Sequence, residues 1–191
     1  MARRLIIGIT GASGVIYGIR ALELLKQLDV ETHLILSPAA KATIAQETNW
    51  KVSDVEALAS VRHDHRNVGA SIASGSFQTL GMLVAPCSIK TLSAIANSYS
   101  SDLMSRAADV CLKEGRPLLL MVRETPLHKG HLKLMLAAAD AGAIIFPPAP
   151  AFYGSPQSLD DIVTGTVGRA LARLGVDNEA YHRWKGMGND K

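Results

Sequence analysis

The residues best suited to binding or catalysis in this 191-residue sequence lie where apolar runs end in small polar residues. The first such stretch, residues 6–18, reads IIGITGASGVIYG and passes through a glycine turn into a helical pattern. A glycine turn that opens directly into a helix presents backbone N–H groups to an anion. The stretch matches neither the G-x-G-x-x-G of dinucleotide-binding folds nor the G-x-x-x-x-G-K-[ST] of P-loop enzymes. It therefore predicts an anion site where Ser13 donates a hydrogen bond, with close helix packing as an equal alternative.

A second stretch suited to binding or catalysis is VRETP, residues 122–126, where opposite charges follow an apolar run. Neighbouring side chains at a strand end point to opposite sides, so Arg123 could bind a phosphate group while Glu124 handles protons. A surface ion pair between the two is an equally good interpretation of these residues alone. Their position at the end of a predicted strand keeps the functional interpretation open.

The histidines and cysteines do not indicate a metal site. Four of the six histidines fall in two close pairs without a third ligand, so we expect surface roles for His63, His65, His128 and His131. The two cysteines, Cys87 and Cys111, lack both a C-x-x-C spacing and the dense pattern of a disulfide framework. We therefore predict no zinc site and a reducing, cytoplasmic setting.

Composition and charge exclude several classes of protein. The chain is 48% hydrophobic and 19% charged, which is typical of a compact α/β protein. Its net charge of +3 comes from scattered residues without a basic run, so no nucleic-acid partner is expected. Glycines interrupt the apolar start of the chain, which favours a buried strand over a signal peptide. No apolar window is long enough to span a bilayer, and we expect no membrane span.

Alternating strands and helices must position the stretches described above. Short apolar runs predict five strands, at residues 4–10, 31–37, 82–85, 117–122 and 142–148. Helical patterns follow them at residues 14–28, 38–48, 88–115 in more than one piece, 128–141 and 159–174. Residues 51–79 show only a short helical stretch near 55–58, and we expect an insertion or active-site loop there. The alternation predicts a three-layered α/β fold with a doubly wound parallel sheet, in one domain over residues 1–178 with a tail over 179–191.

The carboxyl ends of parallel strands meet at one edge of the sheet, and ligands bind at that edge in this fold class. The polar residues expected there are Ser13 after the first strand, Ser37 after the second, and the turn 88–91 after the third. The VRETP stretch follows the fourth strand, and a proline-rich approach to Tyr153 follows the fifth. Hydroxyls, a cation and a carboxylate are therefore expected to converge on one edge.

Seven ordered motifs extend over nearly the whole chain. They are TGASG (10–14), ETHLILS (31–37), QET (46–48), SGSF (74–77), PCSIKTLSAIA (86–96), RAADVCLKEGRPLLLMVRETPLH (106–128) and PPAPAFYGSPQSLDDIV (147–163). In kind and order these motifs resemble the UbiX/Pad family of flavin prenyltransferases. The resemblance is far more specific than the glycine loop alone.

The resemblance implies a Rossmann-like, flavodoxin-like subunit that binds FMN. Members of the family join a dimethylallyl group from dimethylallyl phosphate to N5 and C6 of reduced FMN, without a metal. They supply prenylated FMN to UbiD-type decarboxylases, which serve ubiquinone synthesis or aromatic-acid breakdown, and were earlier described as carboxy-lyases themselves. Their sites lie between subunits of a dodecamer, so the resemblance also implies a homo-oligomer.

Carried onto matching positions, the resemblance implies roles for residues of this chain. The FMN contacts would be Gly11, Ala12, Ser13, Ser37, Ser88, Ile89, Lys90, Thr91 and Arg123. The prenyl phosphate would be received by Lys113, Arg123, Tyr153 and Arg169, some of them from neighbouring subunits, and Trp184 would help Tyr153 to close the pocket. The catalytic residues would be Ser13, Glu47 and Glu124. Lys90 departs from the small residue that some members carry in its turn.

The implied chemistry is reasonable on physical grounds. Cleavage of an allylic C–O bond builds negative charge on the phosphate and positive charge on the allyl group. Fixed cations and an electron-rich flavin can therefore lower the barrier without a metal. Positioning supplies much of the rest. A carboxylate at Glu124, relayed through Ser13, would then remove the proton that must leave C6.

Two alternatives remain beside this interpretation. The first is a flavin-dependent decarboxylase of the peptidyl-cysteine or phosphopantothenoylcysteine type, whose PASANT loop is similar to residues 86–91. Such enzymes need a catalytic histidine after the first helix region and an MN substrate clamp, and neither can be found in this sequence. The second is a flavin carrier without catalysis, which the two carboxylates Glu47 and Glu124 argue against.

Overall fold

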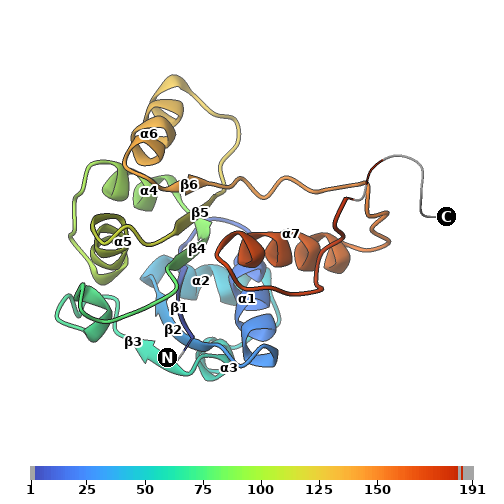
Figure 1. The fold of residues 1–191 in the computed structure, drawn as a ribbon, viewed down its shortest axis with the longest axis horizontal. Helices are drawn as coiled ribbons and strands as arrows, with labels where there is room; N and C mark the ends of the chain where they lie inside the picture. The colour runs from blue at the N-terminus through green and yellow to red at the C-terminus, as the bar shows by residue number, and fades with distance from the viewer. Residues whose placement is uncertain (1–2, 185, 187–191) are drawn as a thin grey trace.

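The structure is a computed structural model that describes residues 3–184 and 186. Its centre is a parallel sheet of six strands in the order β3-β2-β1-β4-β5-β6 (Figure 1). The strands are β1 (Arg4–Ile9), β2 (Glu31–Leu36), β3 (Val61–His63), β4 (Met82–Cys87), β5 (Leu118–Val122) and β6 (Ile144–Ile145). The order runs outward from β1 on one side and from β4 on the other, which confirms the predicted doubly wound sheet.

Helices cover both faces of the sheet and complete three layers. They are α1 (Ile16–Gln27), α2 (Pro38–Glu47), α3 (Val52–Leu58), α4 (Ile89–Ala96), α5 (Leu103–Lys113), α6 (Lys129–Asp140) and α7 (Leu159–Arg173), with a short 3₁₀ turn η1 (Ser71–Ala73). One apolar core joins the sheet to α1, α2, α3 and α7, and a second joins it to η1, α4, α5 and α6. Strands β4 and β5 are buried along their whole length, as expected of central parallel strands.

Most predicted elements are present, with shifts of a few residues at their ends. The predicted number of strands is wrong, because β3 lies inside residues 51–79, where a loop was expected. This strand pairs in parallel with β2 at the edge of the sheet, and its first two residues are exposed. A three-residue edge strand with little buried surface leaves no apolar alternation in the sequence to indicate it. Residues 88–115 form the two helices α4 and α5, as expected.

The chain leaves the compact part of the domain after β6 and returns to it with α7, whose Val167, Ala170 and Leu171 are buried in the first core. The segment of residues 147–158 extends outward in Figure 1, beyond the end of α7. Its Tyr153 ring lies 6.0 Å from the ring of His182 and 5.5 Å from the ring of Trp184, measured between centroids. The segment after α7 also packs on that helix, because Asn178 donates to the Gly168 carbonyl oxygen at 3.0 Å. The predicted tail over residues 179–191 lies partly outside the described residues.

None of the helices in the described part of the chain has the length and apolar character needed to cross a membrane.

Candidate active site at the carboxyl edge of the sheet

The strand order reverses between β1 and β4, and this is where a crevice opens in a doubly wound sheet. The Gly11–Gly14 loop follows β1 on one side of this point, and Ser88 follows β4 on the other. Ser37 follows β2, the next strand outward from β1, and Arg123 follows β5, the next strand outward from β4. The fold therefore brings these predicted site residues to one edge, as the sequence suggested.

Thr10 joins the two halves of the sheet at the reversal point. Its hydroxyl donates to the Pro86 carbonyl oxygen at 2.7 Å and accepts from the Ser88 backbone N–H at 2.9 Å. The side chain is 1% exposed, so both hydrogen bonds are shielded from water. Thr10 thus fixes the start of the glycine loop relative to the Ser88 turn, a role that no pattern in the sequence indicates.

The glycine loop approaches α2 so closely that a side chain at Gly11 would collide with it. A Cβ atom added to Gly11 would lie 2.3 Å from the Cβ atom of Ala39. Gly14 has a φ angle of +96°, which an L-residue with a side chain adopts only with strain. The Gly14 backbone N–H donates to Oε2 of Glu47 at 2.8 Å, so the last residue of α2 holds the loop. Close packing and a functional loop are therefore both features of this stretch.

Two serines at this edge begin helices. The Ser37 hydroxyl accepts from the Ala40 backbone N–H at 3.1 Å and caps α2. The Ser88 hydroxyl accepts from the Thr91 backbone N–H at 3.4 Å and caps α4. Each helix directs the positive end of its dipole at the crevice, which favours an anionic group there. The Ser37 hydroxyl keeps its proton available to a ligand, whereas the Ser88 hydroxyl donates to the Thr91 hydroxyl at 3.3 Å.

Arg123 and Glu124 are exposed just beyond β5. The Arg123 backbone N–H donates to the Cys87 carbonyl oxygen at 3.1 Å, which holds the residue beside the end of β4. Burial raises the pKa of Tyr17 on the first turn of α1, and the positive charge of Arg123 opposes this rise, so the guanidinium lies near α1. Within the described residues neither Arg123 nor Glu124 forms an ion pair, contrary to the surface-pair alternative.

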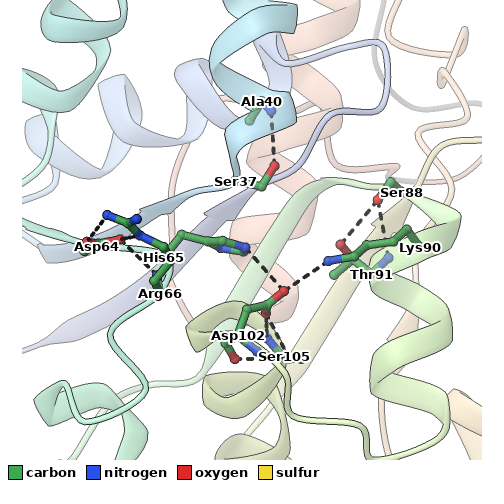
Figure 2. A network of polar contacts seen from close by, with 10 residues as sticks. All are labelled: Ser37, Ala40, Asp64, His65, Arg66, Ser88, Lys90, Thr91, Asp102 and Ser105. Carbon is green, nitrogen blue, oxygen red and sulfur yellow. Dashed lines mark hydrogen bonds and ion pairs between the residues drawn. The ribbon is translucent and has the colours of Figure 1, made fainter.

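A polar cluster around Asp102 lies beside the Ser88 turn and was missed in the sequence (Figure 2). Oδ2 of Asp102 lies 3.1 Å from Nζ of Lys90 and 3.3 Å from Nε2 of His65. Oδ1 accepts from both the backbone N–H and the hydroxyl of Ser105, at 2.9 Å each. Burial alone would raise the pKa of Asp102, but these donors outweigh it and hold the pKa well below its usual range. The D-x-x-S pattern could have indicated the helix cap, but not the partners on α4 and in the loop after β3.

The histidine predictions are partly wrong. His63 and His65 are half-buried rather than on the surface. Nε2 of His63 lies 2.9 Å from Nδ1 of His33, a buried residue of β2. Nε2 of His33 lies 2.9 Å from Oε1 of Glu31. The pairing of β3 with β2 brings the two imidazoles together, so the error follows from the missed strand.

The remaining pair, His128 and His131, lies at the start of α6 with ring centroids 3.6 Å apart. His128 is exposed and caps the helix, while His131 is half-buried. Within the described residues, no group of three or more potential ligands could hold a metal ion.

Three of the predicted substrate-binding residues line a separate open cleft of about 1090 Å³. This cleft lies between α7, the extended segment 147–156 and the segment that follows α7, and it also contains Arg20 of α1. Its walls include Tyr153, Arg169 and Trp184, all exposed. None of the glycine-loop residues or the 88–91 turn lines it. Within one chain, these three residues are therefore separate from the crevice.

Lys113 lies at the opposite edge of the sheet from the crevice. It is the last residue of α5, and the short loop that follows leads into the amino end of β5. Its Nζ pairs with the carboxylate of Glu114 and lies near Gly75. Lys113 could therefore bind the prenyl phosphate at the crevice only if another subunit supplies it.

Taken together, the carboxyl edge offers the N-terminal ends of two helices, a backbone-lined glycine turn, hydroxyls, the carboxylates of Glu47 and Glu124 and the guanidinium of Arg123. Such a set can hold a phosphorylated ligand at the helix ends and exchange protons with it at the carboxylates.

Comparison with known proteins gives close and full-length similarity. Residues 1–171 match the Flavoprotein family. The flavin prenyltransferase UbiX of Escherichia coli strain K12 is 57% identical over 187 residues, covering 96% of this chain and 99% of that protein. The crystal structure of AnUbiX (PadA1) with FMN and dimethylallyl pyrophosphate has a TM-score of 0.96 at 47% identity, covering 98% of this chain and 100% of that one. A dodecameric FMN-dependent UbiX-like decarboxylase of E. coli O157:H7 has a TM-score of 0.92 at 47% identity, covering 96% and 100%.

Proposed function

This chain belongs to the Flavoprotein family and, within it, to the UbiX/PAD1 flavin prenyltransferases, and we propose that it joins a dimethylallyl group to reduced FMN. The observation that carries this proposal is the full-length identity of 57% to a flavin prenyltransferase. The geometry of the carboxyl edge agrees with it, since a ligand with a phosphate group fits the helix ends there. Neither the decarboxylase nor the carrier alternative is favoured.

The residues at the carboxyl edge fit FMN. Ser37 and the N-terminal end of α2, together with the backbone of residues 88–91, would receive its phosphate. Gly11 lets the loop pack directly against α2, because a Cβ atom there would lie 2.3 Å from that of Ala39. Ser13, Arg123 and Glu124 would lie toward the ring. When bound in its reduced form, FMN supplies the electron-rich atoms N5 and C6 that accept the dimethylallyl group.

The phosphate of the allyl donor would be held by cations. Arg123 and Arg169 are exposed residues with charges that suit a phosphate, and the hydroxyl of Tyr153 can donate to it. Because Tyr153 and Arg169 line the cleft beside α7 rather than the crevice, we propose that a neighbouring subunit contributes them. Lys113 would also have to come from a neighbour, and Trp184 would help to close the pocket.

The carboxylates would move the protons. Glu47 already accepts a hydrogen bond from the backbone N–H of Gly14, the residue that follows Ser13 in the glycine loop. Glu124 accepts from the Thr125 backbone N–H at 3.0 Å, which leaves its other oxygen atom available. We propose that Glu124 accepts the proton that leaves the flavin ring, directly or through Ser13, and that Glu47 supports it.

The proposal extends to assembly and setting. The UbiX-like protein of E. coli O157:H7 is dodecameric, and we propose a homo-oligomer of the same kind for this chain. Its product would serve a UbiD-type decarboxylase. We also propose a cytoplasmic setting, with which the two buried free thiols of Cys87 and Cys111 agree.

Anaerobic incubation with reduced FMN and an allyl donor tests the function. Dimethylallyl phosphate and dimethylallyl pyrophosphate should be compared, since the AnUbiX complex holds the pyrophosphate. The flavin mass measured after incubation should increase by one dimethylallyl group. An unchanged flavin mass, with FMN bound, would contradict the proposal. Release of carbon dioxide from an aromatic acid by this protein alone would support decarboxylation instead.

Glu124→Gln tests the proton-accepting role. The amide keeps an acceptor for the Thr125 N–H but cannot take up a proton. We expect the FMN dissociation constant to change by less than about twofold and the rate of prenylation to fall by about 10² or more. Flavin binding by absorbance titration and single-turnover mass analysis measure the two effects. Loss of FMN binding would instead assign Glu124 a structural role.

A further inference from the structure

Tyr17, in the first turn of α1, has no role among the flavin and donor contacts proposed above. Helix α1 begins just after the glycine loop, and side chains in a helix lean toward its N-terminal end. The Tyr17 side chain therefore points toward the carboxyl edge of the sheet. Its ring packs against the first apolar core, and the residue as a whole stays partly exposed.

The Tyr17 ring lies against the glycine loop. A Cβ atom added to Gly14 would lie 3.1 Å from both Cδ2 and Cε2 of the ring. The Tyr17 backbone N–H also donates to the Gly14 carbonyl oxygen at 3.0 Å. Because the Gly14 N–H is held by Glu47, the loop that supports the ring is itself held in place. The ring therefore has a defined position beside the loop.

The first turn of α1 also approaches the end of β4, where Arg123 is held. A Cβ atom added to Gly18, the residue after Tyr17, would lie 2.3 Å from the Ala85 carbonyl oxygen. The Arg123 backbone N–H donates to the carbonyl oxygen of Cys87, two residues further along the same strand. Tyr17 and Arg123 are therefore anchored close together at the end of one strand.

The side-chain alternation of β5 directs Arg123 to the face of the sheet that α1 covers. Met121 is buried in the core that contains α1, whereas Leu120 and Val122 are buried in the core of the opposite face. Since the Arg123 N–H still pairs with β4, the alternation continues and Arg123 shares the face of Met121. Burial raises the pKa of Tyr17 and the positive charge of Arg123 opposes this rise, which agrees with a shared face.

The Tyr17 hydroxyl is a free donor near a free cation. Within the described residues, the tyrosine hydroxyl that forms a hydrogen bond is that of Tyr153, and Arg123 has no ion pair. The Tyr17 hydroxyl is not among the buried polar atoms without a partner, so a ligand can reach it. Its raised pKa keeps the proton in place at neutral pH. A hydroxyl donor beside a guanidinium suits a phosphate group.

We propose that the Tyr17 hydroxyl donates to the phosphate of the allyl donor, beside Arg123, and stabilises the charge that develops there as the allylic C–O bond breaks. The electron pair of that bond stays on the phosphate oxygen, and the allyl carbon forms its new bond with an electron pair of the flavin. The phenol proton remains on Tyr17, which acts as a hydrogen-bond donor and not as an acid. The inference deepens the proposed function and rests on it for the identity of the donor.

Tyr17→Phe tests this role, because phenylalanine keeps the ring against Gly14 and removes only the hydroxyl. We expect kcat/KM for dimethylallyl phosphate to fall at least about tenfold, as when one donor to a developing anion is lost. The FMN dissociation constant should change by less than about twofold. Flavin mass analysis over a range of donor concentrations gives the first quantity, and absorbance titration gives the second. Urea unfolding should show the wild-type midpoint, since the packing is kept.

Tyr99→Phe is the matched control. Tyr99 is 67% exposed and follows the end of α4 that points away from the crevice, so its hydroxyl should not affect kcat/KM. Equal kcat/KM values in Tyr17→Phe and Tyr99→Phe would overturn the proposal. Weaker FMN binding in Tyr17→Phe with unchanged donor kinetics would also overturn it, because the hydroxyl would then serve the flavin. A wild type that does not prenylate FMN would contradict the proposed function instead.

Discussion

At the scale of single residues, the two carboxylates of the site differ in what they already hold. Among the described residues, Glu47 accepts from the backbone of the glycine loop, whereas the one donor to Glu124 is the residue that follows it. The first carboxylate therefore shapes the loop as well as taking part in the proposed chemistry. Substitutions at Glu47 should affect flavin binding in a way that substitutions at Glu124 do not.

Glu47→Ala and Glu47→Gln separate these two contributions. The alanine variant leaves the Gly14 N–H without its partner, so we expect FMN to bind about tenfold more weakly. The glutamine variant retains a carbonyl acceptor and should bind FMN nearly as tightly as the wild type, with slower prenylation. Flavin titration and single-turnover rates measure both. Equal FMN affinities in the two variants would show that the hydrogen bond does not order the loop.

Ser37→Ala tests the position of the flavin phosphate. Loss of the cap should lower the free energy of unfolding by about 1 kcal/mol, as for other N-cap serines. The FMN dissociation constant should rise, while the affinity for riboflavin, which lacks the phosphate, should stay the same. Urea unfolding and parallel titrations with the two flavins measure these effects. A matching loss of riboflavin affinity would place the phosphate elsewhere.

At the scale of elements, sequence patterns predicted the helices and strands whose formation depends on residues close together in the chain. The first strand, its glycine turn and α1 follow one another in the sequence, and all three were predicted. Strand β3 could not be, because its stability comes from pairing with β2 rather than from its own exposed residues. The polar cluster around Asp102 likewise joins three segments that are separate in the sequence. Family resemblance supplied the site residues and implied that some come from neighbouring subunits, but it did not indicate that Tyr153, Arg169 and Trp184 share a separate cleft.

The approach of the glycine loop to α2 gives a prediction at this scale. Gly11→Ala should destabilise the fold by about 1–3 kcal/mol, as overpacking does, because its Cβ would lie 2.3 Å from that of Ala39. Ala39→Gly added to Gly11→Ala should restore part of the loss. Urea unfolding of both single variants and the double variant measures the coupling. Additive effects would mean that the loop moves away from α2 instead.

At the scale of the whole molecule, the free energy of unfolding should depend on pH through ionisable residues of β2 and β3, at one edge of the sheet. Burial lowers the pKa of His63, so as pH falls below about 6.5 the unfolded chain takes up a proton that the folded chain resists. Hydrogen bonds from Arg4 and His33 lower the pKa of Glu31, and the stability that they provide is lost only at more acidic pH, below the usual carboxyl range. Both effects weaken the fold on acidification.

His63→Gln isolates the histidine contribution. Glutamine can still donate to His33 but does not titrate, so the free energy of unfolding should fall less steeply between pH 7 and pH 5 than in the wild type. Urea titrations across this range measure the slope. An unchanged slope in His63→Gln would show that His63 is not responsible.

The buried hydroxyl of Thr10 has a consequence for the time course of ligand capture. It uses its donor and an acceptor position to hold the Pro86–Ser88 turn against the start of the glycine loop, before any ligand is present. Because the two sides of the crevice are already held in place, the protein need not rearrange when the flavin binds, and little conformational entropy is lost. Flavin association should then occur in one kinetic phase, with an observed rate that rises linearly with flavin concentration. Thr10→Val, which keeps the shape but removes both bonds, should add a slower second phase.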